Sequence, residues 1–406
     1  MKITYICQYF STPQKGVAGS RAYEFAKRLV ARGHKVTIVS GIYSLKKRAE
    51  VNEEFIRHEE QDGMKLIWIN LVYSTHQGFF YRVWNFILFS AVSSWIALRL
   101  PCDLVFATSP PLTVGIPGLL AKWFRRKPFV FEVRDLWPDF PIAMGILKNH
   151  VAIWMIKRVE KKIYKSSSRI IVLAPGIRDS IAQTGYPKEQ LILIPNACDL
   201  ELFMPSEIKP IRKKLRVGND ELVLIYMGAH GRANGLDAII DVAAEIQERQ
   251  ENGIQFVLIG DGSEKQRLMD RAQRLNLTNI QFLPPMPKQE LATIVNEADV
   301  GMQILKNVPT FYWATSPNKF FDYISAGLPV LINYPGWLAE IIKQNQCGVE
   351  IVSENPQAFA DAVILMKKQR HSLKEMGKRS RLLAEKKFDR NKLAMKFIET
   401  IENIRG

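Results

Sequence analysis

The sequence predicts an α/β protein made of two successive doubly wound sheets. Apolar runs of strand length alternate with helical patterns along almost the whole chain, which is typical of parallel sheets covered by helices on both faces. The series of strands restarts after a polar, proline-bearing stretch at 196–220. The length of 406 residues also exceeds the size at which a single core usually stops growing. We therefore expect a domain at 1–195, a second at 196–387, and a C-terminal helix at about 388–406 that packs back on the first.

Each expected strand is a short run rich in branched and aromatic side chains. In the first domain these runs lie at 2–7, 35–39, 65–71, 103–107, 128–133, 169–173 and 191–194. In the second domain they lie at 222–227, 254–259, 280–283, 300–303 and 329–332. Two such sheets would leave a central crevice that faces the carboxyl ends of their strands, where ligands bind in this class of fold.

The balance of charges predicts an anionic partner. The formal net charge of +16 suits a nucleotide, a nucleic acid or the phosphate-rich face of a membrane. No recognised nucleic-acid motif accompanies the charge, so we expect no nucleic acid as partner. The four cysteines lie far apart without metal or redox spacing, and the chain begins with a strand-like run rather than a signal peptide. We therefore expect a cytoplasmic protein with neither a disulfide framework nor a zinc site.

The segment 83–100 raises the question of a membrane span, because Arg99 is its only charge. One half of its helical wheel holds the polar side chains of Asn85, Ser90, Ser93 and Ser94. The segment also lies between two strands of one sheet, which a spanning helix would separate. We expect a buried or membrane-grazing helix.

A second candidate for membrane contact is the helix expected at about 151–165. One arc of its wheel holds five cations, namely Lys157, Arg158, Lys161, Lys162 and Lys165, and the opposite side is apolar. A solvated outer face explains such an arc equally well. Trp154 lies inside the arc, where an anionic headgroup layer suits an indole better than water does. We therefore predict that this helix binds the anionic inner face of the cell membrane.

Two glycine-bearing loops each lie between a strand and a helix. In the first loop, Gly16 and Gly19 would let the backbone approach a ligand, and the amides at the start of the helix favour phosphate. A structural turn explains these glycines about as well, because their spacing matches neither the dinucleotide motif nor the P-loop. The second loop repeats the arrangement with Gly228 and Gly231, and adds the cation of Arg232.

A helix expected after Pro317 carries a cation in its first turn. Lys319 opposes the helix dipole there unless an anion compensates it. Asp322 follows three residues later on the same face, so Lys319 can bind a diphosphate while Asp322 accepts hydrogen bonds from ribose hydroxyls. An ion pair between these two side chains on the surface is the alternative.

These residues belong to motifs that resemble family 4 glycosyltransferases in order and spacing. The motifs are 16–32, Asp135-Leu-Trp-Pro138, 194–203, 259–262 and 317–327. The resemblance covers nearly the whole chain and is greatest to the branch that contains WbuB, an L-N-acetylfucosamine transferase of O-antigen assembly. It implies a GT-B fold, retention of anomeric configuration, no essential metal or other cofactor, and usually a UDP-linked donor. The second domain would bind the nucleotide-sugar, and the first would face a membrane-held, lipid-diphosphate-linked glycan acceptor.

The sequence departs from the family in the loop that holds the diphosphate. Many members have an arginine after the first glycine of the second loop and a lysine before its last glycine, where this chain has Ala229 and Asn234. Arg232 and Lys319 would then supply the cations, together with the backbone of the first glycine loop. Asn318 completes the expected nucleotide-sugar site. These cations would stabilise the charge that builds on the leaving β-phosphate.

Two further departures concern the sugar and the acceptor. Of the two acids that the family places eight positions apart, Asp322 stands for the second and Ala314 occupies the first. The common histidine after the fifth strand is Arg134 here, followed by Asp135. We predict Arg134, Asp135 and Glu132 on the acceptor side. Asp135 is the first candidate to orient or deprotonate the acceptor hydroxyl, with Glu132 second and a structural role for Asp135 as the alternative.

Two other classes of function stay open at this stage. A sugar-nucleotide epimerase could use the same pair of domains, but it would need its own acid and base around the sugar, and no such set stands out. A protein that binds nucleotide-sugar or glycan without turnover is conceivable because Ala314 replaces an acid.

Overall fold

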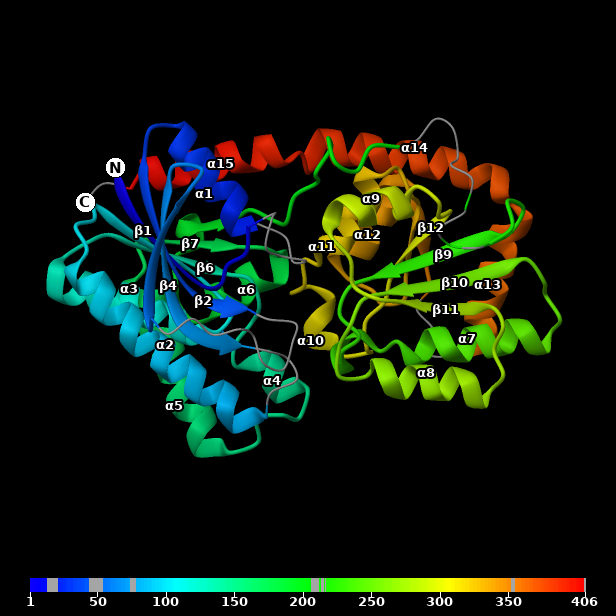
Figure 1. Ribbon diagram of the computed structural model, residues 1–406, viewed down its shortest axis with the longest axis horizontal. Helices are drawn as coiled ribbons and strands as arrows, with labels where there is room; N and C mark the ends of the chain where they lie inside the picture. The colour runs from blue at the N-terminus through cyan, green and yellow to red at the C-terminus, as the bar shows by residue number, and fades with distance from the viewer. Residues whose placement is uncertain are drawn as a thin grey trace. The chain divides into compact units, whose positions relative to one another are not determined.

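The computed structural model describes residues 1–12, 21–43, 54–73, 78–205, 212, 215, 217–351 and 355–404. The chain divides into two compact units. The first comprises Met1–Pro195, Trp313–Ser316 and Asn391–Gly406, and the second comprises Asn196–Tyr312 and Pro317–Arg390. Each unit is built around a largely parallel sheet with helices on both faces (Figure 1). The predicted α/β class with two parallel sheets is confirmed.

The sheet of the first unit has the strand order β3-β4-β2-β1-β5-β6-β7-β8. Its strands are β1 (Lys2–Tyr9), β2 (Lys35–Tyr43), β3 (Ile56–Gln61), β4 (Met64–Tyr73), β5 (Leu104–Thr108), β6 (Phe129–Val133), β7 (Arg169–Val172) and β8 (Leu191–Leu193). β5 and β6 are buried along their whole length, which explains their nearly continuous apolar sequences. β3 was not predicted. It is a polar edge strand that pairs antiparallel with β4.

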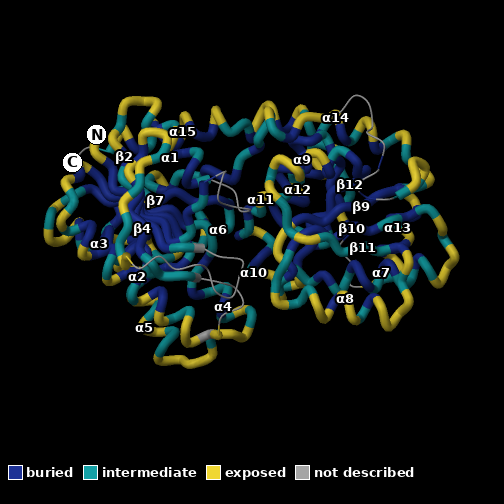
Figure 2. The backbone as a smooth tube through the Cα atoms, in the orientation of Figure 1, coloured by how far each residue is buried: buried dark blue, intermediate teal, exposed yellow. Residues whose placement is uncertain are grey.

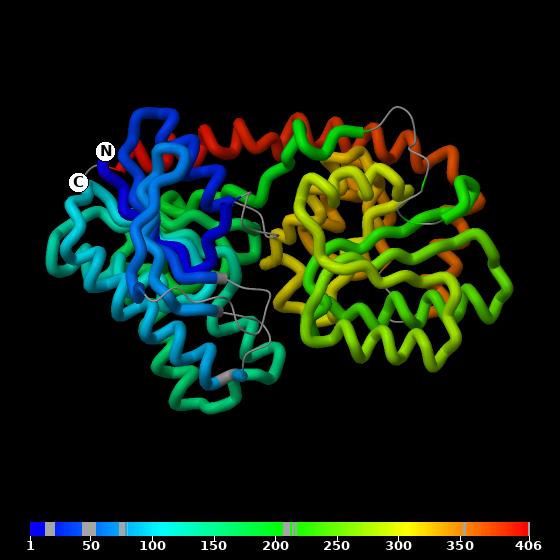
Figure 3. Tube along the Cα trace, in the orientation of Figure 1, coloured from blue at the N-terminus to red at the C-terminus, as the bar shows by residue number. Residues whose placement is uncertain are grey.

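The helices of the first unit are α1 (Arg21–Ala31), α2 (Phe79–Arg99), α3 (Gly115–Arg125), α4 (Asp139–Ala143), α5 (His150–Ser166), α6 (Pro175–Gln183) and α15 (Arg390–Glu402), with short 3₁₀ turns at Leu112–Val114 and Lys188–Gln190. α15 packs on this unit through Phe397, whose ring lies 4.6 Å from that of Phe25 and 5.2 Å from that of Phe106. The C-terminal helix therefore lies beside the N-terminal elements (Figure 3). None of the described helices is long and apolar enough to cross a membrane.

Two glycines bring α3 close to its neighbours. A Cβ atom added at Gly118 would lie 2.1 Å from the ring of Phe129 on β6, and one added at Gly115 would lie 2.8 Å from Ile163 on α5. Both positions therefore exclude larger side chains. α3 also packs against α2, so it lies between two helices of the same layer.

The sheet of the second unit has the strand order β11-β10-β9-β12-β13-β14, and all its pairs are parallel. Its strands are β9 (Leu222–Met227), β10 (Ile254–Ile259), β11 (Ile280–Leu283), β12 (Val300–Gln303), β13 (Val330–Ile332) and β14 (Gly348–Glu350). Its helices are α7 (Asp237–Glu248), α8 (Lys265–Arg274), α9 (Lys288–Val295), α10 (Pro309–Tyr312), α11 (Asn318–Ser325), α12 (Trp337–Asn345), α13 (Pro356–Lys368) and α14 (Arg370–Lys387), with a 3₁₀ turn at Arg232–Asn234. The edge strand β14 was not predicted. Both sheets form buried layers (Figure 2).

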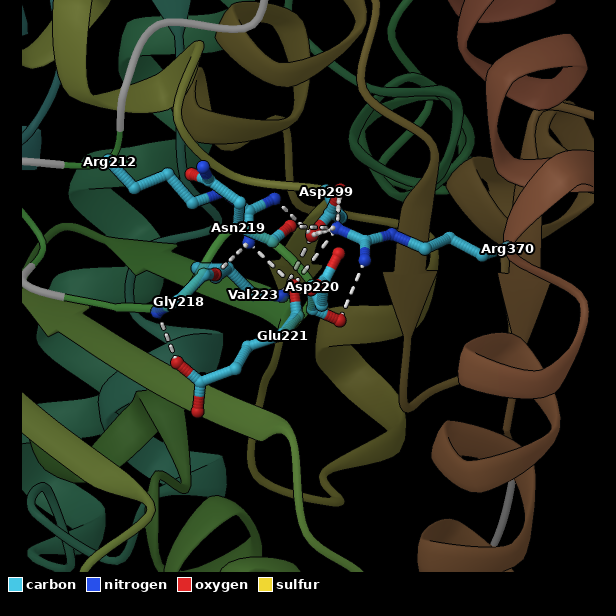
Figure 4. A network of polar contacts seen from close by, with 8 residues as sticks. All are labelled: Arg212, Gly218, Asn219, Asp220, Glu221, Val223, Asp299 and Arg370. Atoms are coloured by element: carbon cyan, nitrogen blue, oxygen red, sulfur yellow. Dashed lines mark hydrogen bonds and ion pairs between the residues drawn. The ribbon is translucent and has the colours of Figure 1, made fainter.

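A buried ion-pair network ties the start of this second sheet to the helix α14. The carboxylate of Asp299 accepts hydrogen bonds from Arg212 at 2.7 Å, from the backbone N–H of Val223 at 2.9 Å and from Arg370 at 3.2 Å (Figure 4). Arg212 and Asp299 are both buried. Removing the carboxylate would leave a guanidinium charge in the interior, which is far more costly than losing an exposed pair.

Candidate active site

In the second unit, the glycine loop that follows β9 meets a further glycine-bearing loop, 260–262, which follows β10. The backbone N–H of Gly228 donates to the carbonyl of Ile259 at 2.9 Å, and that of His230 donates to the carbonyl of Asp261 at 2.9 Å. A Cβ atom added at Gly260 would lie only 1.9 Å from the carbonyl oxygen of Gly228. Gly228 and Gly260 also have φ values of +131° and +146°, which other residues rarely adopt. Both positions therefore need glycine to keep these loops together.

Lys319 reaches over this pair of loops from the first turn of α11. Its Nζ donates to the hydroxyl of Tyr226 at 2.7 Å, and a Cβ atom at Gly228 would lie 3.2 Å from its Cε. The side chain is half-buried, and no carboxylate among the described residues forms an ion pair with it. Burial lowers the pKa of Lys319 to about 7. An ammonium group in this position has the properties of an anion site.

His230 and Lys265 lie beside Lys319, although neither was among the predicted site residues. His230 is fully buried, and neither of its ring nitrogens has a hydrogen-bond partner in the described part of the chain. Burial, together with the positive charges of Lys265 and Lys319, lowers the pKa of His230 to about 4, so the imidazole is neutral at physiological pH. The Nζ of Lys265 donates to the carbonyls of Gly260 at 2.7 Å and Leu283 at 2.9 Å.

The loop that follows His230 carries the second predicted cation. Gly231 precedes a short 3₁₀ turn that begins with Arg232. The side chain of Arg232 is 78% exposed, and its closest acid is Glu264 at 3.4 Å. A weak pair of this kind contributes little to stability and leaves the guanidinium free to move to a ligand. Arg232 therefore differs from Lys319, whose position is fixed by packing.

Asp322 is held apart from Lys319 on α11. Its carboxylate is buried and pairs with the Nζ of Lys288 at 3.2 Å. Burial raises the pKa of Asp322, and the neighbouring Lys288 opposes this effect. The alternative of an ion pair between Lys319 and Asp322 is therefore wrong, because each has another partner. Asn318, the first residue of α11, is exposed.

In the first unit, the predicted acceptor-side residues lie at the end of β6 and have different environments. The carboxylate of Glu132 is buried and accepts hydrogen bonds from Arg21 at 3.0 Å and from the hydroxyl of Thr108 at 2.6 Å. The same Arg21 also donates to the backbone carbonyls at 194 and 195. The carboxylate of Glu132 is thus held in a buried ion pair with α1 and a hydrogen bond to β5. The sequence contained Arg21 at the end of the first glycine loop but gave no sign of this pairing.

Asp135 is the less constrained of the two carboxylates. It is half-buried and has no hydrogen-bond or ion-pair partner among the described residues. Burial raises its pKa, and the adjacent Arg134 opposes the shift. The backbone N–H of Arg134 donates to the hydroxyl of Ser109 at 3.0 Å, which fixes the chain just ahead of Asp135. Gly16 and Gly19, predicted to face the donor, lie outside the described residues.

The comparisons with known proteins agree on one class of enzyme. One family model, described as "Glycosyl transferase 4-like domain", matches residues 16–197, and a second, "Glycosyl transferases group 1", matches residues 207–383. WcaI of Escherichia coli K12, which is named as a colanic acid biosynthesis glycosyl transferase, is 22% identical over 340 residues, or 80% of this chain and 82% of WcaI. The protein is a glycosyltransferase.

Solved structures show that this glycosyltransferase has the GT-B fold that the resemblance implied. Sucrose-phosphate synthase of Thermosynechococcus elongatus matches with a TM-score of 0.78 at 18% identity, covering 99% of this chain and 98% of the synthase. HepE of Anabaena, solved in complex with UDP-glucose, matches with a TM-score of 0.72 at 16% identity, and all of both chains is covered. At these identities the likeness concerns the fold.

The structure describes three positions at which the chain departs from the pattern of family 4 glycosyltransferases. The carbonyl of Ala229 accepts a hydrogen bond from the hydroxyl of Tyr226 at 2.9 Å, and Asn234 closes the 3₁₀ turn that Arg232 begins. Ala314 is buried in a segment that belongs to the first unit. Among the described residues, no group of three or more histidines, cysteines or acids is arranged to hold a metal ion. The independence of metal stays a prediction.

Proposed function

We propose that this glycosyltransferase transfers a sugar from a UDP-linked donor, with retention of configuration and without a metal ion, to a lipid-diphosphate-linked glycan at the inner face of the cell membrane. The part of this proposal that concerns the nucleotide-sugar donor rests on the environment of Lys319. Its ammonium is half-buried, lacks a carboxylate partner among the described residues, and lies at the carboxyl ends of parallel strands, where ligands of such sheets bind. The complex of the structurally similar HepE with UDP-glucose supports a nucleotide-sugar as the ligand.

The proposed chemistry needs positive charge at the leaving group. The bond between the anomeric carbon and the β-phosphate oxygen breaks, a new bond to the acceptor oxygen forms on the same face, and UDP departs with the electron pair. Lys319, Arg232 and the first amides of α11 would stabilise the phosphate charge. Asp135 would orient the acceptor hydroxyl and take its proton. Its carboxylate is available for this role, whereas that of Glu132 is bound by Arg21.

The nature of the donor sugar and of the acceptor is proposed from the resemblance and the relatives. N-acetyl-L-fucosamine is the first sugar to test, because the loop residues are most similar to the branch that transfers it. A glycan in the assembly of O-antigen, capsule or exopolysaccharide is the proposed acceptor, and the name of WcaI supports a polysaccharide pathway.

The membrane half of the proposal rests on α5. All the predicted contact residues are on its exposed side: Trp154, Lys157, Arg158, Lys161, Lys162 and Lys165. The guanidinium of Arg158 stacks on the indole of Trp154 at 4.1 Å, and of these cations only Lys157 has an ion-pair partner among the described residues, Asp139 at 2.9 Å. Replacing Lys161, Lys162 and Lys165 by glutamine should weaken binding to anionic vesicles by about a hundredfold, since each cation contributes on the order of 1 kcal/mol. Sedimentation like that of the wild type would leave α5 as a solvated face.

The deciding experiment offers the protein a panel of UDP-sugars with a lipid-diphosphate N-acetylglucosamine acceptor, and identifies products by mass spectrometry and anomeric configuration by NMR. We expect a disaccharide with the configuration of the donor. Conversion of the UDP-sugar into its epimer would indicate the epimerase instead. Tight donor binding with no product from any donor would indicate a binding protein.

A further inference from the structure

The helix α2 buries its polar residues together with some apolar ones, and its exposed side is apolar. The exposed residues of its outer stripe recur at the spacing of a helical face, and apart from Arg99 at its end they are apolar: Phe80, Tyr81, Trp84, Ile87, Ala91 and Trp95. The side chains of Phe80, Trp84 and Ile87 are 87%, 61% and 53% exposed. A surface helix normally turns its polar residues toward the solvent and its apolar residues toward the core. Large apolar patches of this kind mark a binding surface.

Hydrogen bonds on the inner side fix this orientation. The amide of Asn85 donates to the carbonyl of Val72 at 2.9 Å, and the hydroxyl of Ser90 donates to the carbonyl of Thr113 at 3.0 Å. Ser93 bonds to a carbonyl one turn back along α2 at 2.6 Å. Rotating the helix to bury its exposed aromatic side chains would break the bonds of Asn85 and Ser90 to neighbouring elements and would expose the buried ring of Phe89. The apolar stripe is therefore built to face outward.

The apolar surface continues from α2 onto α3. Trp123 and Phe124, near the end of α3, are 52% and 73% exposed. Arg125 donates to the carbonyls of Ala97 and Leu100, so the two helices end side by side. We call the set Phe80, Tyr81, Trp84, Ile87, Trp95, Trp123 and Phe124 the aromatic face.

Cations border the aromatic face. The guanidinium of Arg99 lies 4.4 Å above the ring of Trp95, and Lys122 and Arg126 are exposed beside Trp123. Indole and phenol rings with cations at their edge match the boundary between anionic headgroups and acyl chains. A second copy of this chain would bring the same cations against each other, which disfavours a self-association surface.

We propose that the aromatic face inserts into the headgroup boundary of an anionic phospholipid bilayer, with α2 lying along the membrane plane. The inference deepens the membrane part of the proposed function, because it adds an apolar contact to the charges of α5. Two turns into α2, the ring of Phe86 packs edge-on against that of Trp137, two residues after Asp135, with the ring centres 6.4 Å apart. Insertion at α2 would therefore hold the acceptor-side residues close to the lipid.

The test compares the wild type with the variant Phe80→Ser, Trp84→Ser, Ile87→Ser in co-sedimentation with vesicles of phosphatidylcholine, alone or with phosphatidylglycerol. We expect the triple variant to bind both vesicles about a hundredfold more weakly or worse, because these side chains lose apolar area that the bilayer would cover. The matched control is Leu365→Ser, Leu382→Ser, two exposed apolar residues of the second unit, which should bind like the wild type. All the substituted side chains are exposed, so the melting temperatures should agree.

Salt and fluorescence separate this contact from that of α5. Binding through the aromatic face should persist at high salt and on phosphatidylcholine alone, whereas the contribution of the α5 lysines should disappear under both conditions. Brominated lipids should quench the tryptophan fluorescence of the wild type, and Trp84→Phe, Trp95→Phe should lose much of that quenching. Wild-type binding by the triple variant would overturn the inference. So would a concentration-dependent dimer in light scattering that the triple variant abolishes.

Turnover of a short-tailed, water-soluble acceptor distinguishes failure of this inference from failure of the proposed function. The triple variant should keep wild-type turnover, because its substitutions lie outside the candidate active site. If no protein turns over any acceptor but vesicle binding follows the expected pattern, the proposed reaction fails and the aromatic face stands.

Discussion

Replacing Lys319 by methionine tests the anion site directly, because methionine keeps most of the volume of the side chain and removes its charge. The variant should lower kcat by roughly a hundredfold or more, the scale that follows loss of a charge-stabilising contact. It should not unfold the protein. The pKa of Lys319 is lowered in the folded state, so its charge opposes folding below about pH 7, and this penalty fades as the pH rises toward the unfolded pKa. The melting temperature at pH 6 to 7 should therefore be unchanged or higher.

The pH dependence of donor binding follows from the same pKa of about 7. A bound diphosphate favours the ammonium form and raises the pKa, so binding above pH 7 takes up a proton. The Kd for a UDP-sugar should be flat below pH 7 and should rise about tenfold per pH unit above it. The diphosphate of a UDP-sugar is a diester, so its own charge does not change in this range.

The assay is isothermal titration calorimetry with UDP-N-acetylglucosamine, without acceptor, between pH 6 and pH 9. Buffers with different heats of ionisation measure the proton uptake. Lys319→Met should bind weakly with no dependence on pH, and Lys319→Arg should also show none, because arginine stays protonated throughout. The reasoning is refuted if the wild type has a flat Kd above pH 7, or if Lys319→Met keeps the slope of the wild type.

Four further outcomes are expected. Arg232→Ala should lower kcat by roughly a hundredfold, and a near-wild-type rate would place the phosphate elsewhere. Asp135→Asn should lower kcat with little effect on donor Kd in calorimetry, as expected for a group that acts on the acceptor. Turnover should survive EDTA, and complete loss restored by Mg²⁺ or Mn²⁺ would contradict the metal-free mechanism. Asp299→Ala should lower the free energy of unfolding by about 3–5 kcal/mol in urea titrations, because Arg212 is left buried without its acid; a loss below about 1 kcal/mol would show that this pair behaves like an exposed one.

Most of the strands could be predicted from sequence because parallel strands buried on both faces are nearly continuous apolar runs. β5, β6 and β9 are buried along their whole length and were all expected. β3 has the sequence Ile-Arg-His-Glu-Glu-Gln and pairs on one side only, so it carries no such run. β14 is the edge strand of the sheet in the second unit, and its three residues are too few to show a periodic pattern.

The candidate site was predictable where local physics fixes a residue. Lys319 stood out because a cation in the first turn of a helix needs a compensating anion, and the structure leaves that ammonium without a carboxylate partner in the described part of the chain. Its partner Tyr226 and the neighbouring His230 come from other elements, so only the fold brings them together. The environment of Glu132 could not be predicted from the sequence. Its pairing with Arg21 spans 111 positions, which no spacing argument could reach.

The helices α2 and α5 show why periodicity cannot say which side of a helix faces the protein. In both sequences one half of the wheel is polar, and an unpaired polar half normally faces water. The cations of α5 follow that rule, because a charge is too costly to bury alone. The serines and the asparagine of α2 do not follow it, because each donates a hydrogen bond to a backbone carbonyl inside the fold. Small neutral polar groups thus permit either orientation. The orientation of α2 leaves Phe80, Trp84 and Trp95 exposed, and so gives the first unit an apolar surface in addition to the basic one on α5.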